Sequence, residues 1–550
     1  MLSLGAVLPF VGVITQPDKI SDFPVVGQIA SIIGIEPGAG MIFPLAIIFA
    51  SAALLANGFR LLLLWYGLRL ANDTGADIGV EVFRRTLYQP YSVHISRGSN
   101  EVIASITQKV GLATGVLIAV ANMGTSLILF ASILATLLVI NPVMAIVAGI
   151  SFGLAYIGIA AVTRRRLVRN SQRIAKEQTQ VVKSLQEGLG AIRDVLLDGT
   201  QRVYCSGYRN SVYPLQRAAS ENSFIGAAPR FIMEAVGMIL VSILVLLLSR
   251  SNEGIVTTLP MLGVLGIAAQ RLLPLMQLIF GNWATVSGSR AALNDVLSLL
   301  EQPLIEGGEK EPSPMGLSGS IKFENVGFRY GTAESWVLKN VSFEIAKGER
   351  VGFVGSTGSG KSTTLDLLMR LLEPVEGKIL IDGRQVDSSN TRAWQRTIAH
   401  VPQHIFLSDA SIAENIAFGV PLGDIDIERV RTVARQAKIA DFIESRPLGY
   451  QAAVGERGVR LSGGQRQRIG IARALYKQAS VLIFDEATSA LDHETEQAVM
   501  AAIEDLSQDL TILIIAHRLT TLQGCSQVIK LDGGHAYSVS YKDIVSEKTK

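Results

Sequence analysis

Cysteines and charged side chains are scarce in this sequence. Its 550 residues include two cysteines, Cys205 and Cys525, which lie far apart in the chain. This spacing excludes a disulfide framework and a cysteine-based zinc site, and it suits a reducing compartment. The formal net charge of +3 is close to balance and argues against a nucleic-acid partner. The chain is too long for one hydrophobic core, so we expect two or three domains.

Charge is almost absent from long stretches of the first half. No charged residue occurs between Lys109 and Arg164, a run long enough for two membrane spans with a tight turn at Asn141-Pro142. Further apolar runs predict spans within residues 40–70, 231–248 and 255–286. With residues 1–14 as an incomplete first span, the sequence predicts a membrane all-α bundle of six transmembrane helices over residues 1–300.

Basic residues predict the orientation of this bundle. Arg84, Arg85 and Arg97 lie between the second and third spans, and Arg164 to Arg166 begin the long segment between the fourth and fifth. Because such residues favour the cytoplasmic side, the long loops and everything after Val286 are expected there. The loops have a helical pattern, with turns predicted near residues 88–99 and 198–210. The predicted location is therefore a cell membrane, crossed several times.

Two features of the membrane half allow a functional and a structural interpretation. Residues 24–35 form either an apolar helix at the outer membrane interface or a loop that merely avoids charge. Arg60 and Arg271 lie within predicted spans, where an arginine costs at least ~2.5 kcal/mol, and Arg230 precedes Glu234 by one helical turn. These arginines form either a cationic patch for an anionic headgroup or ion pairs that stabilise the bundle.

The second half has the composition of a soluble domain. Residues 301–317 are rich in Pro, Gly and Glu and are predicted to be a linker, and residues 318–550 are predicted to form an α/β domain. Within it, Gly355 to Ser362 reads GSTGSGKS and follows the strand-like run 350–354. A helix-forming run, 363–372, comes next. Strand, glycine loop and helix start together predict a phosphate cradle, although a glycine-rich turn could end in Lys-Ser by chance.

Several other residues suit nucleotide chemistry. Lys361 can reach the β- and γ-phosphates, and the Ser362 hydroxyl can hold Mg²⁺. A buried strand over residues 480–484 ends in Asp485-Glu486, where Asp485 can position Mg²⁺ and Glu486 can polarise a water molecule. The LSGGQ sequence at residues 461–465 precedes a helix and offers a second anion-binding helix start.

In this order the motifs resemble those of the ATP-binding cassette (ABC) family over residues 318–531. The resemblance implies an α/β P-loop ABC ATPase domain with ATP and Mg²⁺ as cofactors, and a dimer in which LSGGQ of a second copy completes each site. It implies that Glu486 is the general base, that His517 contacts the γ-phosphate and that Gln403 relays nucleotide state. The implied catalytic residues are Glu486, His517, Gln403 and Lys361. The implied nucleotide contacts are Tyr330, Gly355, Ser356, Thr357, Gly358, Ser359, Gly360, Lys361, Ser362, Thr363, Gln403, Ser462, Gly463, Gly464, Gln465, Asp485 and His517. The implied Mg²⁺ positions are Ser362, Gln403 and Asp485.

The membrane half is similar to that of type IV ABC exporter half-transporters. More narrowly, it resembles the bacterial flippase for lipid-linked oligosaccharides of protein N-glycosylation and related polysaccharide exporters. Residues 24–35, Arg60, residues 228–230 with Glu234, and residues 271–274 carry this likeness. It implies that Arg60, Arg230 and Arg271 bind the pyrophosphate of the substrate. The chain departs from the flippase at Leu278, where the flippase has a basic residue.

We therefore expect an ATP-driven ABC exporter or flippase that works as a homodimer. The expected cargo is a lipid-linked oligosaccharide or a similar polyprenyl-pyrophosphate glycan, moved across the cytoplasmic membrane. Its expected partners are a second copy of itself, membrane lipids and this glycan. The alternatives are an ABC exporter of another lipid, a peptide or a drug, and an ATP-gated regulatory ABC protein.

Overall fold

The structure is a computed structural model with two separate units. It describes residues 42–140, 142–249, 255–304, 312–331, 334–486, 496–498, 500–501, 509–515 and 522–541. The described residues up to Leu304, apart from Pro90–Val93, form a helical unit, and Pro90–Val93 with the described residues from 312 onward form an α/β unit. The predicted outer segment, 24–35, and the predicted incomplete first span, 1–14, lie outside the described residues.

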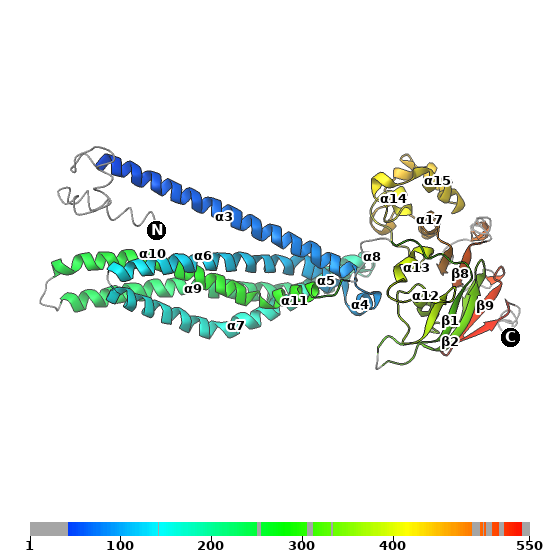
Figure 1. Cartoon of the computed structure of the whole chain (residues 1–550), viewed down its shortest axis with the longest axis horizontal. Helices are drawn as coiled ribbons and strands as arrows, with labels where there is room; N and C mark the ends of the chain where they lie inside the picture. The colour runs from blue at the N-terminus through cyan, green and yellow to red at the C-terminus, as the bar shows by residue number, and fades with distance from the viewer. Residues whose placement is uncertain are drawn as a thin grey trace. The chain divides into compact units, whose positions relative to one another are not determined.

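The helical unit consists of long helices joined by short connections (Figure 1). Its elements are α3 (Ile42–Leu87), the last part of α4 (Tyr91–Ser96), α5 (Ser99–Ala104), the π-helix η3 (Ser105–Lys109), α6 (Val110–Ile140), α7 (Pro142–Gly190), α8 (Ile192–Leu197), α9 (Gln201–Ser249), α10 (Ile255–Gly288) and α11 (Arg290–Leu300). Helices α6, α7, α9 and α10 lie side by side, because their apolar faces pack around buried residues such as Leu167, Met233 and Phe280. Among the described residues, the helical stretch Ser99–Leu138 is long and apolar enough to cross a membrane. The expected count of six spans stays a prediction.

The predicted turns of the helical unit were placed with different success. The turn at Asn141-Pro142 is confirmed, since α6 ends at Ile140 and α7 begins at Pro142. The turn predicted at residues 198–210 is confirmed only for residues 198–200, since α9 begins at Gln201. The helix breaks earlier, from Gly190 to Thr200, because Ala191 leaves the helical conformation and Gly199 adopts a φ of +63°. Gly207, which suggested the later turn, lies inside α9.

A buried polar junction separates α10 from α11. The Asn222 side chain of α9 accepts a hydrogen bond from Asn170 at 3.0 Å and donates one to the Gly288 carbonyl at 3.5 Å. A Cβ atom on Gly288 would lie 2.7 Å from the Asn222 amide nitrogen, so a larger residue there would displace this side chain. The Ser171 hydroxyl of α7 accepts a hydrogen bond from the Ala291 amide at 2.7 Å. Ser171 thus caps α11 in place of a residue of that helix.

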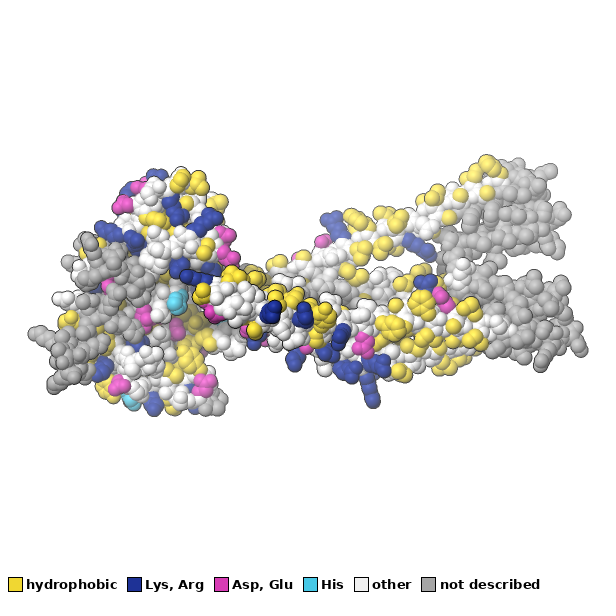
Figure 2. Space-filling model, turned by 180° about the vertical axis from the view of Figure 1, so that it is seen from behind, with side chains coloured by type: hydrophobic (Ala, Val, Ile, Leu, Met, Phe, Trp, Pro, Cys, Tyr) yellow, Lys and Arg dark blue, Asp and Glu magenta, His cyan; other side chains and the backbone are white. Residues whose placement is uncertain are grey.

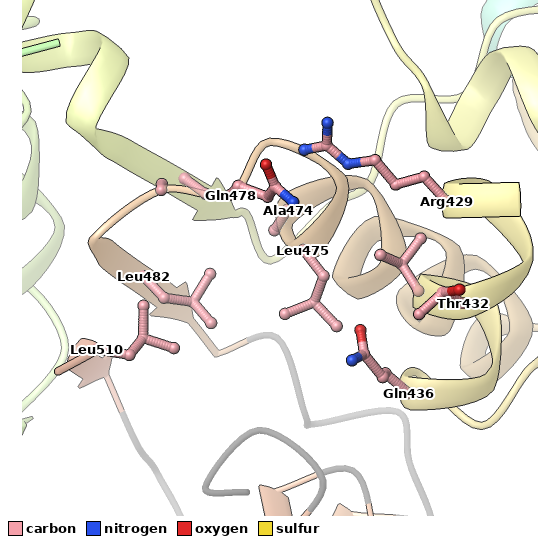
Figure 3. Close-up of a pocket in the computed structure, with 11 residues that line it drawn as sticks. Arg429, Thr432, Gln436, Ala474, Leu475, Gln478, Leu482 and Leu510 are labelled. Carbon is pink, nitrogen blue, oxygen red and sulfur yellow. The ribbon is translucent and has the colours of Figure 1, made fainter. Parts of the chain in front are cut away.

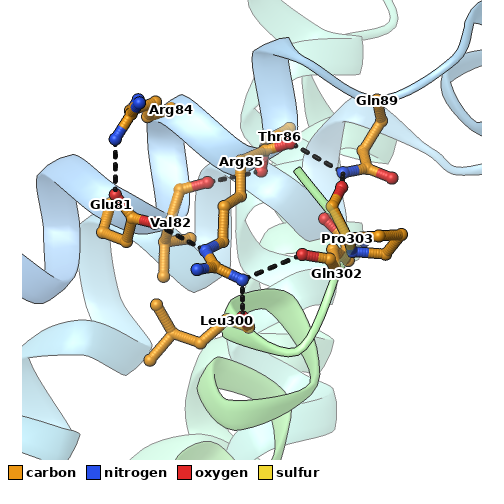
Figure 4. Close-up of polar contacts among 9 residues, drawn as sticks. All are labelled: Glu81, Val82, Arg84, Arg85, Thr86, Gln89, Leu300, Gln302 and Pro303. Atoms are coloured by element: carbon orange, nitrogen blue, oxygen red, sulfur yellow. Dashed lines mark hydrogen bonds and ion pairs between the residues drawn. The ribbon is translucent and has the colours of Figure 1, made fainter. Parts of the chain in front are cut away.

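The C-terminal end of α11 is held by the end of α3 (Figure 4). The Arg85 guanidinium donates hydrogen bonds to the carbonyl oxygens of Leu300 and, at 2.9 Å, Gln302. Glu81 lies 2.6 Å from Arg85 Nε and orients the guanidinium. The Gln89 amide donates to the Pro303 carbonyl at 3.1 Å. These contacts satisfy carbonyls that a helix end leaves without a partner.

The α/β unit contains two sheets. Its strands are β1 (Ser320–Phe328), β2 (Leu338–Ala346), β3 (Arg350–Val354), β4 (Glu376–Ile381), β5 (Arg384–Gln385), β6 (Ile398–Val401), β7 (Val481–Asp485), β8 (Thr511–Ile515), β9 (Gln527–Asp532) and β10 (His535–Val539). An antiparallel sheet has the order β2-β1-β4-β5. The other sheet has the order β10-β9-β3-β8-β7-β6 and is parallel except for β10. Its apolar strands are buried on both faces, as expected for a parallel sheet.

Helices cover these sheets and form a small subdomain (Figure 1). They are α12 (Lys361–Leu368), α13 (Thr391–Thr397), α14 (Ile412–Ile416), α15 (Ile427–Gln436), α16 (Ala440–Glu444) and α17 (Gly463–Tyr476). The helix predicted over residues 363–372 ends earlier, at Leu368, because Arg370 adopts a φ of +53°. A helical unit followed by an α/β unit agrees with the predicted fold class. The predicted domain boundaries at 300 and 317 stay predictions.

Candidate active site

The glycine loop joins the centre of the parallel sheet to a helix. Strand β3 lies between β8 and β9, and α12 begins at Lys361 directly after the loop. Gly360 caps α12 with a φ of +98°, and a Cβ atom there would lie 2.7 Å from Leu338 Cδ2. Gly358 also adopts a positive φ, +81°. The loop can therefore keep its shape only with glycine at these positions, and the N-terminus of α12 favours an anion.

Two side chains of the loop suit a phosphate ligand. The Lys361 ammonium donates hydrogen bonds to the carbonyl oxygens of Gly355 and Ser356, each at 2.9 Å, so it lies over the loop. Lys361 is 8% exposed. The buried Ser359 hydroxyl has no hydrogen-bond partner in the described part of the chain. A buried cation and a hydroxyl without a partner fit the oxygen atoms of a bound phosphate chain.

Two acidic side chains, on β7 and α12, lie close enough to influence each other. Asp485 is the last residue of β7. Burial and the nearby charge of Asp485 raise the pKa of the Asp366 carboxyl in α12 to about 6. No group of three His, Cys, Asp or Glu side chains suited to a metal occurs among the described residues. A carboxylate such as Asp485 and a hydroxyl such as that of Ser362 are oxygen ligands of the kind that Mg²⁺ uses, with phosphate and water oxygens completing its shell.

The structure brings Gln403 and Glu486 together. The Gln403 side-chain amide donates a 2.7 Å hydrogen bond to Glu486 Oε2. Glu486 has a φ of +50°, and its amide donates to the carbonyl of Ile515 at the end of β8 at 3.2 Å. The two residues are far apart in the sequence, and they meet because β6 and β7 are neighbouring strands. His517 and residues 489–492 lie outside the described residues.

Tyr330 and the LSGGQ segment have well-defined local structures. The Tyr330 hydroxyl lies 3.1 Å from Thr363 Oγ1 of α12, and its ring is 49% exposed. Ser462 and Gln465 form a capping box at the start of α17, with distances of 3.3 and 2.9 Å. This box holds the helix start in place and leaves Gly463 and Gly464 in its first turn. The contact with Thr363 places Tyr330 beside α12, the helix that follows the glycine loop.

The three predicted substrate arginines have different surroundings. The Arg60 side chain is exposed on α3. Arg230 Nε lies 2.9 Å from Glu234 Oε1, and both side chains are largely exposed. This pair partly offsets the positive charge of Arg230. The side chain of Arg271 lies outside the described residues.

Asp366 was not predicted from the sequence, although an acidic residue among the buried leucines of α12 was a usable signal. A cavity of about 330 Å³ between α15, the end of α17 and the strands β6 and β7 was not predicted either (Figure 3). Apolar residues such as Leu475, Leu482 and Leu510 line this cavity together with Arg429 and Gln436. None of the lining residues is a predicted nucleotide contact.

Known proteins are similar to this chain over most of its length. Residues 338–489 match the model of the family described as ABC transporter, and residues 5–258 match the ABC transporter transmembrane region. The ATP-dependent lipid A-core flippase of Cupriavidus metallidurans is 32% identical over 85% of this chain and 78% of its own length. The ATP-dependent lipid A-core flippase of Alkalilimnicola ehrlichii is 31% identical over 91% of this chain and 84% of its own length.

The fold is also that of a solved transporter. A bacterial Atm1-family ABC exporter with ATP bound superimposes with a TM-score of 0.81, 24% identity, and coverage of 100% of this chain and 95% of that one. This likeness concerns the fold. Together with the family matches and the relatives, it extends over both halves of the sequence. The chain belongs to the ABC transporter family and couples ATP hydrolysis to transport across a membrane.

Proposed function

We propose that this chain is an exporter of a lipid and that two copies form the working transporter. The supporting observation is that relatives named as lipid A-core flippases align with more than three quarters of their own length. This favours the expected alternative, an exporter of another lipid, over a lipid-linked oligosaccharide flippase. Leu278 agrees with that preference, because an exposed leucine stands where the oligosaccharide flippase has a basic residue.

In the proposed site, Lys361 and the loop amides bind the phosphates of ATP, and Tyr330 stacks on adenine. Ser362, Gln403 and Asp485 would hold Mg²⁺, which supplies positive charge to the reacting phosphate. Glu486 accepts a proton from the attacking water, and its positive φ and its hydrogen bond from Gln403 fix the carboxylate. We also propose that His517 contacts the γ-phosphate.

A second copy is part of this proposal. Its residues Ser462, Gly463, Gly464 and Gln465 would complete the site formed by the glycine loop of the first copy. The capping box supports this role, because it fixes a helix start whose amides can bind phosphate oxygens. Among the membrane residues, we propose that Arg60 and Arg271 contact the lipid headgroup. The Glu234 pair gives Arg230 a weaker role in binding an anion.

Reconstituted vesicles test the transport proposal. The purified chain is reconstituted with a fluorescent lipid A-type glycolipid or a labelled polyprenyl-pyrophosphate oligosaccharide, and exposure at the outer leaflet is followed with ATP and Mg²⁺. We expect ATP-dependent movement of the glycolipid. Glu486→Gln should retain ATP binding but reduce hydrolysis and movement by about 100- to 10,000-fold. Movement of the oligosaccharide alone, or equal rates for wild type and Glu486→Gln, would overturn the proposal.

A further inference from the structure

One face of α7 is apolar along its first half and exposed. From Pro142 to Val162 the helix has no charged residue and extends about 30 Å, the thickness of a bilayer hydrocarbon core. Exposed side chains recur at intervals of three to five residues along this part, which places those from Ile146 to Ile157 on one side of the helix. They are Ile146, Ile150, Leu154, Ile157 and Val162, with exposures of 49%, 55%, 65%, 67% and 74%.

Three exposed arginines follow this apolar stretch directly. Arg164 lies two helical turns after Ile157, and Arg165 lies three turns after Leu154, so both continue the apolar face. Arg166 is exposed beside them. Leu167 is fully buried in the core of the bundle, which fixes the rotation of the helix and keeps the arginines outward. Figure 2 shows Lys and Arg side chains gathered on the helical unit beside hydrophobic surface.

These arginines have no salt bridge among the described residues, unlike some other exposed arginines of the same unit. Arg69 pairs with Asp73, and Arg230 pairs with Glu234, each on its own helix. On α7 the first acidic residue after the arginines is Glu177, about three turns further on. The positive charge at residues 164–166 is therefore not offset locally, and it lies where an apolar face of bilayer length ends.

We propose that Arg164, Arg165 and Arg166, here termed the α7 arginine cluster, bind the headgroups of anionic phospholipids in the cytoplasmic leaflet. The apolar face contacts the acyl chains, and the guanidinium groups contact the phosphates of the same lipids. The occupant is bulk membrane phospholipid and not transported cargo. The inference uses the membrane region of the chain and does not depend on the proposed cargo.

The test measures binding of dioleoyl phosphatidylglycerol and dioleoyl phosphatidylcholine to the full chain in detergent by native mass spectrometry. The variant combines Arg164→Gln, Arg165→Gln and Arg166→Gln. The matched control combines Arg202→Gln, Arg209→Gln and Arg217→Gln. These α9 arginines are also exposed. They lie roughly 20 Å or more along the helix before residues 231–248, the predicted membrane span of α9, which is beyond the Debye length.

We expect wild type to prefer phosphatidylglycerol, and the α7 variant to bind it 10- to 100-fold more weakly with unchanged phosphatidylcholine binding. The control should remain within about twofold of wild type, and three Arg→Lys changes in the cluster should retain most binding because the charge remains. Equal affinity of wild type for both lipids, or equal loss in variant and control, would refute the proposal. Displacement of phosphatidylglycerol by a single bound transported lipid would also refute it, since the surface would then hold cargo.

A salt titration of wild type covers the case in which the α7 variant does not fold. Raising the salt concentration from 0.05 to 0.5 M shortens the range of the attraction. We expect at least a tenfold weaker affinity for phosphatidylglycerol and no such change for phosphatidylcholine. A salt-independent affinity for phosphatidylglycerol contradicts the proposal.

Discussion

Lys109 and Asp295 form a salt bridge that joins η3 to α11. Their Nζ and Oδ2 atoms are 2.7 Å apart, and the Lys109 side chain is 3% exposed whereas that of Asp295 is 43% exposed. A buried ammonium loses its hydration, and Asp295 offsets this cost. The two residues are therefore not equivalent: loss of Asp295 leaves a buried charge without a counter-ion, whereas loss of Lys109 leaves a half-exposed carboxylate.

The first prediction concerns this dependence. Asp295→Asn should destabilise the protein by roughly 1–3 kcal/mol, less than for a fully buried pair because Asp295 is half exposed. Lys109→Met together with Asp295→Leu should cost less than Asp295→Asn alone, since no charge is then left buried. Thermal unfolding of the three proteins in one detergent measures both effects. A double variant that unfolds at a lower temperature than Asp295→Asn would contradict this dependence.

The second prediction concerns Arg85. Arg85→Lys keeps the charge but loses the planar guanidinium, which donates to both Leu300 and Gln302. We expect faster amide hydrogen exchange in a peptide that covers residues 297–304, since the end of α11 frays more often. Arg97→Lys is the control, because Arg97 pairs with Glu101 on the neighbouring helix turn. Unchanged exchange in the Arg85 variant would mean that the guanidinium does not hold this helix end.

The third prediction compares two glycines with positive φ. Gly383→Ala has open space around the new Cβ atom and should cost about 1–2 kcal/mol from backbone strain. Gly360→Ala must also displace Leu338 and should cost a further ~1–3 kcal/mol. ATP with Mg²⁺ should raise the melting temperature of Gly383→Ala as in wild type but not that of Gly360→Ala. Equal stabilisation of both variants by ATP would argue against a phosphate cradle at Gly360.

The fourth prediction concerns pH. Burial lowers the pKa of the His400 imidazole in β6 to about 4. The unfolded chain binds a proton as the pH falls below ~6.5, whereas folded His400 stays neutral until about pH 4. The associated stability is therefore present above ~pH 6.5 and is lost as the pH falls toward 4.

His400→Leu should remove this loss. Between pH 7 and pH 4.5 the variant should lose on the order of 2 kcal/mol less stability than wild type. His535→Leu is the control, because His535 is exposed on β10. Melting curves across this pH range measure the difference. If wild type and His400→Leu lost the same stability as the pH falls, other groups would be responsible for the acid sensitivity.

Local patterns predicted the parts of the fold that depend on short stretches of sequence. The strand Arg350–Val354 has the predicted bounds, because an apolar run ends in a glycine loop whose spacing permits little else. The turn between α6 and α7 was also predictable, since proline begins a helix readily and cannot continue one. The turn after α7 was misplaced, because Gly207 is tolerated inside a helix and its position gave a false signal.

Contacts between distant residues could not be predicted in the same way. Sequence order identified Gln403 and Glu486 as candidates, but their hydrogen bond depends on the pairing of β6 with β7. The capping of α11 by Ser171 depends on the packing of α7 against α11 and has no local signature. Arg85 could be used as a sign of orientation, but its role as a helix cap is visible only in the folded chain.

Helix α11 is supported at three points along its short length. Ser171 holds its start, Lys109 its middle and Arg85 its end, and these residues belong to α7, η3 and α3. A rigid rod with three supports cannot pivot about any one of them. A force applied at Leu300 is therefore shared among three helices, and no single substitution should release α11 completely. Because of these three contacts, we expect α11 to move only together with α7, η3 and α3.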